Sequence, residues 1–118
     1  AMADSGETHI LDRLAAVIES RRGGDPETSH TARLFAKGPE KIAQKVGEEA
    51  VETVIARLAL GQAALAEESA DLLYHLLVLW ADAGLDPDEV WTVLETRAGT
   101  SGVEEKRRRG RVEGGARE

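Results

Sequence analysis

The sequence predicts an all-α fold, a four- to five-helix antiparallel bundle that dimerises through apolar helix faces. Apolar residues recur at spacings of three and four along most of the chain, and glycine or proline separates these runs. Only 3% of the 118 residues are aromatic, so leucine, alanine and valine must build the core, as they do in helix bundles. A chain of this length suits one domain with a modest core, which a second copy would extend.

The first two predicted helices span residues 9–21 and 28–37. Thr8 precedes the first helix as a plausible N-cap, because its hydroxyl can accept a hydrogen bond from the first turn. Gly38 ends the second helix, and the proline that follows fits the first turn of the next one. The apolar face of the first helix consists of Ile10, Leu14, Val17 and Ile18.

Two long helices are predicted next, over residues 39–60 and 62–83, with Gly61 between them. The second of these is apolar around most of its circumference, so we expect it to be buried by the bundle or by a second subunit. One broad apolar side of the first helix carries Ile42, Val46, Ala50, Val54 and Leu58. Its other side carries Lys41, Lys45, Glu48, Glu49 and Glu52.

A last helix is predicted over residues 87–97, where Asp86 and Pro87 supply its cap and first turn. Its apolar face consists of Val90, Trp91 and Leu94. Residues 1–98 are therefore expected to form one all-α domain. Residues 99–118 are rich in glycine, arginine and glutamate, which predicts a mobile C-terminal tail.

Two acidic pairs on the neighbouring long helices are the strongest functional signal. Glu49 and Glu52 share one helix face, as do Glu68 and Asp71, because each pair is three residues apart. Fifteen residues separate Glu52 from Glu68, enough to turn the chain into an antiparallel partner helix. Facing acidic pairs would repel unless cations lay between them, and oxygen ligands favour Mg2+ or Mn2+. Solvated surface pairs are the alternative, since glutamate on helices is usually exposed.

A basic series leads into these acids. Lys37, Lys41 and Lys45 recur every four residues, and Arg33 lies one turn before them. They could clamp phosphate groups beside the metal site. The alternative is a solvated basic face supported by neighbouring glutamates.

His75 and Tyr74, which follow the second acidic pair on the same predicted helix, each allow more than one interpretation. His75 follows Asp71 by one turn, so it could hydrogen-bond a metal-binding carboxylate, although a core role is the more common one. Tyr74 is interpreted as a core or dimer contact, and the alternative is a platform on which a base stacks.

Composition excludes several classes of function. The absence of cysteine excludes disulfides, zinc–thiolate sites and thiol catalysis. No apolar run approaches the ~20 residues that cross a bilayer, and no signal peptide is evident, so a cytoplasmic location without membrane association is expected. The net charge of −7 argues against a nucleic-acid partner, which normally needs a basic surface.

The acidic motif resembles that of a known family. Glu48-Glu49-x-x-Glu52, followed after fifteen residues by Glu68-x-x-Asp71, is similar to the signature of MazG-like all-α nucleoside triphosphate pyrophosphohydrolases. More narrowly, the chain resembles the phosphoribosyl-ATP pyrophosphohydrolases of histidine biosynthesis. The segments that carry this narrower resemblance are residues 29–34, 37–42, 44–49, 68–77 and 97–106.

The resemblance implies an all-α homodimer with sites near its interface. It also implies that Mg2+ binds to four of the acids, and that Glu48 is a further ligand or a base that orients water. Phosphate groups would contact the three lysines, and Ser101 and Lys106 of the tail could close over the substrate. The implied metal ligands are Glu49, Glu52, Glu68 and Asp71.

The resulting hypothesis is a Mg2+-dependent enzyme that cleaves the α–β phosphoanhydride of phosphoribosyl-ATP to phosphoribosyl-AMP and pyrophosphate. One alternative is a housecleaning pyrophosphohydrolase of noncanonical nucleotides, with the same acids and a different base pocket. Another alternative is a non-catalytic helical dimer that binds metal. Such a protein would need no basic series for phosphate, so the lysines speak mildly against it.

Overall fold

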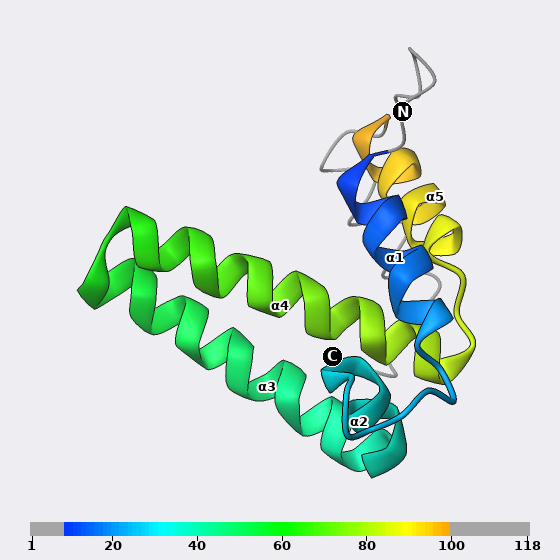
Figure 1. Ribbon diagram of the computed structural model, residues 1–118. Helices are drawn as coiled ribbons and strands as arrows, with labels where there is room; N and C mark the ends of the chain where they lie inside the picture. The colour runs from blue at the N-terminus through cyan, green and yellow to red at the C-terminus, as the bar shows by residue number, and fades with distance from the viewer. Residues whose placement is uncertain (1–8, 100–118) are drawn as a thin grey trace, which may run out of the picture. The chain divides into compact units, whose positions relative to one another are not determined.

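The computed structural model describes residues 9–99, and this part of the chain contains five α-helices, one short π-helical turn and no strand (Figure 1). The predicted all-α class is therefore confirmed. The helices are α1 (Ile10–Ser20), α2 (His30–Lys37), α3 (Pro39–Ile55), η1 (Ala56–Leu60), α4 (Gln62–Ala83) and α5 (Pro87–Ala98). None of the described helices combines the length and the apolarity needed to cross a membrane.

The chain divides into two compact units, with the boundary between Leu85 and Asp86. The first unit contains α1 to α4 and the second contains α5. Asp86 caps α5 by accepting a hydrogen bond from the backbone of Asp88, as the sequence predicts. The prediction of a single domain over residues 1–98 stays a prediction, and the predicted tail lies almost wholly outside the described residues.

The helices begin and end close to the predicted capping, glycine and proline residues, with two differences. The N-cap of α1 is His9 rather than Thr8, because Nδ1 of His9 accepts the backbone N–H of Leu11 at 3.0 Å. The predicted helix over residues 39–60 ends in the π-helical turn η1, where the backbone N–H of Gly61 reaches back to the carbonyl of Ala56. Gly61 has a φ of 117°, which only glycine adopts easily, so the chain reverses there into α4.

The core of the first unit lies where α1, α2, the beginning of α3 and the second half of α4 meet. Complete burial of each large apolar side chain contributes about 1.5–3 kcal/mol, so these contacts fix the four helices relative to one another. The core residues are Ile18, Leu34, Ile42, Leu77 and Val78.

The apolar face predicted for α3 is only partly correct. Ile42 is fully buried, but Val54 and Leu58 are 57% and 76% exposed, whereas Glu49 is only 7% exposed. Residues four apart advance about 40° around a helix, so a row with that spacing turns away from α4. The line that faces α4 instead repeats every seven residues, through Ile42, Glu49 and Ala56. The prediction that Glu49 lies on the side away from the core was therefore wrong.

Candidate functional site

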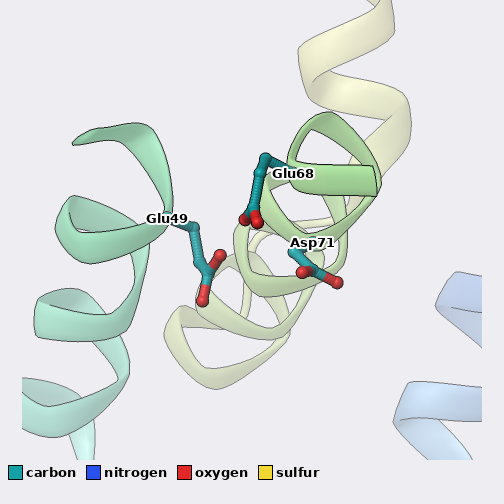
Figure 2. A group of neighbouring side chains, drawn as sticks. All are labelled: Glu49, Glu68 and Asp71. Atoms are coloured by element: carbon teal, nitrogen blue, oxygen red, sulfur yellow. The ribbon is translucent and has the colours of Figure 1, made fainter. Parts of the chain in front are cut away.

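Three carboxylates meet between α3 and α4 (Figure 2). Glu49 extends from α3 towards Glu68 and Asp71, which lie one turn apart on α4. One oxygen from each of the three residues lies within 4.8 Å of the others. The hairpin of α3 and α4 brings these residues together, as the fifteen-residue spacing predicts.

Two oxygens of this acidic cluster lack a hydrogen-bond partner on the protein. Within residues 9–99, the buried side-chain atoms without such a partner are Glu49 Oε1, Glu68 Oε1 and His75 Nδ1. An unpaired buried charge is costly, and a bound cation would compensate it. The cluster supplies only oxygen ligands, which fit a hard divalent ion. The residues present therefore fit a metal site.

The surroundings of Glu68 favour its neutral form when no cation is bound. Burial raises the pKa of Glu68 above its usual value of 4.5, and the nearby carboxylates of Glu52, Asp71 and Glu49 raise it further. Glu52 thus adjoins the cluster, although it is not one of the three residues whose oxygens converge.

A polar network on α3 borders the acidic cluster. Lys45 Nζ lies 3.4 Å from Glu48 Oε1 and 3.7 Å from Glu49 Oε2. Gln44 donates its side-chain amide to Glu48 at 2.7 Å and accepts a hydrogen bond from Lys41 at 3.3 Å. The Gln44 contact is the main reason that the pKa of Glu48 is lowered, and Lys45 contributes next. Sequence reasoning missed Gln44, because no spacing rule singles out a glutamine among charged neighbours.

The other residues predicted to bind substrate lie on α2 or outside the described residues. Gly38 interrupts the helix between Lys37 and Lys41, so the basic series is divided between α2 and α3. Arg33 donates a hydrogen bond from Nε to the carbonyl of Pro26 at 3.1 Å. Ser101 and Lys106 lie outside the described residues.

The rings of His30 on α2 and of Tyr74 and His75 on α4 are in aromatic contact beside the acidic cluster. The ring centroids of Tyr74 and His75 are 4.9 Å apart, and His30 lies 6.2 Å from Tyr74. The Tyr74 hydroxyl shares a 2.5 Å hydrogen bond with Thr31. His75 is only 6% exposed, and burial is the main cause that lowers its pKa, with the positive charge of Lys45 acting in the same direction. The lowered pKa favours the neutral form of His75.

Comparison with known proteins agrees with the resemblance read from the acidic motif. The family model for phosphoribosyl-ATP pyrophosphohydrolase matches residues 11–98. The chain belongs to the phosphoribosyl-ATP pyrophosphohydrolase family. This family is part of the MazG-like all-α superfamily, so both levels of the predicted resemblance are confirmed.

Individual relatives of the family align over most of their length. The phosphoribosyl-ATP pyrophosphatase of Azospirillum brasilense is 64% identical over 100 residues, which cover 85% of this chain and 90% of that protein. The protein of the same name from Paramagnetospirillum magneticum is 59% identical over 103 residues, which cover 87% and 94%. That of Rhodospirillum rubrum is 58% identical over 97 residues, which cover 82% and 83%. The acidic cluster and the neighbouring Lys41 and Lys45 lie within the part matched by the phosphoribosyl-ATP pyrophosphohydrolase model.

Proposed function

We propose that this chain hydrolyses the α–β phosphoanhydride of phosphoribosyl-ATP to phosphoribosyl-AMP and pyrophosphate, the second step of histidine biosynthesis. The observation that carries this proposal is the convergence of Glu49, Glu68 and Asp71, with two unpartnered buried oxygens, in a member of this family. Its relatives are named for the same substrate.

The acidic cluster would hold Mg2+, or Mn2+ in its place. Glu49, Glu68 and Asp71 offer converging oxygens, and Glu52, whose carboxylate lies near Glu68, would be a fourth ligand. When bound, the ion would neutralise charge on the phosphate oxygens and acidify a coordinated water molecule. Occupancy would also relieve the repulsion that raises the pKa of Glu68.

Glu48 would orient the attacking water. Its lowered pKa keeps the carboxylate ionised, and Gln44 fixes one of its oxygens, so the group can accept a hydrogen bond from water beside the metal site. The water oxygen forms a bond to phosphorus while the α–β phosphoanhydride bond breaks. One proton of the water leaves towards Glu48, and pyrophosphate departs.

The basic residues would hold the phosphate groups. Lys45 lies against the acidic cluster and Lys41 lies one turn further away, so their charges extend outward from the metal site along α3. Arg33 and Lys37 would extend this clamp from α2. Charges placed at the leaving pyrophosphate stabilise the transition state most strongly in a site that excludes water. Ser101 and Lys106 are proposed to close over the substrate.

A second copy of the chain would cover the exposed apolar residues at the end of the α3–α4 hairpin. Val51, Val54, Ile55, Leu58 and Leu60 are all between 47% and 76% exposed. A homodimer would remove this surface from water, and burial stabilises a dimer by about 25 cal/mol for each Å² of apolar area. We further propose a cytoplasmic location, and no nucleic-acid partner because of the acidic charge of the chain.

The test is pyrophosphate release from phosphoribosyl-ATP, compared with ATP and dUTP at equal concentrations. The proposal predicts Mg2+-dependent release from phosphoribosyl-ATP. The kcat/KM for ATP and for dUTP should be lower by a factor of at least about 100, because these nucleotides lack the phosphoribosyl group that the site contacts. Release mainly from dUTP would favour a housecleaning enzyme. Metal binding without hydrolysis would favour a non-catalytic dimer.

A further inference from the structure

One hydroxyl connects the backbones of the two helices that supply the acidic cluster. Thr53 Oγ1 lies 2.8 Å from the carbonyl oxygen of Glu49 on α3 and 3.2 Å from the carbonyl oxygen of Glu68 on α4. A threonine hydroxyl has a single hydrogen, so the two carbonyls share it. Thr53 is half-buried between the helices.

The two contacts differ in meaning. A threonine that bonds the carbonyl four residues earlier is a common local arrangement within a helix. The contact with Glu68 spans fifteen residues of sequence and crosses from α3 to α4. It therefore fixes how α4 lies against α3 at this level of the hairpin.

The residues tied together are the two whose side chains carry the unpartnered buried oxygens of the acidic cluster. Glu49 Oε1 and Glu68 Oε1 both lack a partner on the protein. When both carboxylates are ionised and no cation lies between them, they repel each other, which would push the helices apart. The shared hydroxyl opposes this separation from the backbone side, without contacting the carboxylates.

We infer that Thr53 is a positioning residue of the metal site, which holds Glu49 and Glu68 at the separation that a divalent cation needs. This inference rests on the proposed function, because it concerns the ion that the acids are proposed to bind. Thr53 acts through the backbone of the two ligand residues. Its loss should therefore weaken metal binding even where the helices remain folded.

The test compares metal affinity in variants that differ by one hydroxyl. Thr53→Val keeps the shape of the side chain and removes the hydroxyl, whereas Thr53→Ser keeps the hydroxyl. Calorimetric titration with Mg2+, and the loss of the free Mn2+ signal in electron paramagnetic resonance, give the Kd without substrate. We expect Thr53→Val to raise the Kd about tenfold, at the lower end of what outer groups around metal sites contribute.

The controls separate positioning from general stability. Thr28→Val removes a hydroxyl that bonds the Asp25 carbonyl within a surface turn, and it should leave the Kd unchanged. Circular dichroism in EDTA confirms that each variant is helical. Thr53→Ser should bind within about threefold of the unchanged chain, because serine keeps the hydroxyl hydrogen that the two carbonyls share. If Thr53→Val does not fold, the pair Thr53→Ser and Thr53→Ala repeats the comparison.

The outcomes are distinguishable. Equal affinities in the variants with and without the hydroxyl would overturn the role of Thr53 while leaving the proposed function intact. If the unchanged chain bound neither ion, the proposed metal site would fall, and the inference with it. A tenfold loss that the serine variant recovers would establish Thr53 as a positioning residue.

Discussion

Gln44 donates a 2.7 Å hydrogen bond from its side-chain amide to Glu48, one turn further along α3. The same amide group accepts a hydrogen bond from Lys41, so its orientation is fixed at both ends. This places an uncharged side chain between a proposed phosphate-binding lysine and the carboxylate proposed to orient water. The pKa of Glu48 is lowered chiefly by this contact.

Replacing Gln44 should change the pH dependence of turnover. In Gln44→Ala the pKa of Glu48 rises, because its ionised form loses a donor. The acid limb of the kcat profile should therefore move to higher pH. Rate–pH profiles that extend well below pH 4.5 measure this shift, and Gln62→Ala, which replaces an exposed glutamine at the start of α4, is the control. An unchanged acid limb would contradict the proposed role of Glu48.

Glu68 should make the metal-free protein less stable as the pH rises. The pKa of Glu68 is raised in the folded state, so its contribution to the free energy of unfolding is fully present below about pH 4.5 and is lost as the pH rises through the folded pKa. Relative to Glu68→Gln, the Tm of the unchanged chain in EDTA should fall between pH 4.5 and pH 7. Parallel Tm curves for the two proteins would contradict this prediction.

Mg2+ should reverse that loss in the unchanged chain. A ligand that binds only the folded state raises stability, by about 2.7 kcal/mol at 100 times its Kd. At pH 7 the ion should therefore raise the Tm of the unchanged chain by several degrees and that of Glu68→Gln by much less. An equal rise in both proteins would place the ion elsewhere.

The helices were largely predictable from the sequence, whereas the inner face of α3 was not. Pro39, Gly61 and Gly84 mark helix ends by backbone geometry, which is a local property of the chain. Which residues of α3 face α4 depends on the packing of the partner helix. Hydrophobicity therefore assigned Val54 to the inside and Glu49 to the outside, and packing reversed both.

Within the candidate site, the acids were predictable and the residues that support them were not. The i, i+3 spacing places Glu68 and Asp71 on one side of α4, and the fifteen-residue connection allows that side to face the acids of α3. Gln44 and Thr53 carry no such signal, because their importance lies in side-chain contacts that form only after the hairpin closes.

Lys41→Ala should weaken substrate binding more than turnover. The lysine lies one turn from Lys45 and away from the converging acids, so its charge should act on the phosphate chain of bound substrate. We expect KM for phosphoribosyl-ATP to rise about tenfold, equivalent to about 1.4 kcal/mol, with kcat changed less. Steady-state kinetics measure both constants. The control is Arg57→Ala, which removes a charge from η1 and should change neither constant. An unchanged KM in Lys41→Ala would contradict the proposal that Lys41 binds the phosphate groups.

Leu58→Lys should dissociate the proposed dimer. Leu58 is 76% exposed and belongs to the apolar surface at the end of the hairpin, so a lysine there would bring a charge into the interface. Light scattering after size-exclusion chromatography should give twice the 12.7 kDa chain mass for the unchanged protein and a single chain mass for the variant. Ile10→Lys, at an exposed apolar residue of α1, should leave the mass unchanged. A monomeric unchanged protein would contradict the proposal of a dimer.

The most direct test of the acidic cluster is pyrophosphate release from phosphoribosyl-ATP by the unchanged chain and by Asp71→Asn. The variant keeps the size of the side chain and removes one charge, so circular dichroism should show an unchanged fold. We predict Mg2+-dependent release by the unchanged chain, none in EDTA, and a fall in kcat/KM of at least about 100-fold in the variant. Release that persists in EDTA, or a variant as active as the unchanged chain, would contradict a metal-dependent hydrolase built on these acids.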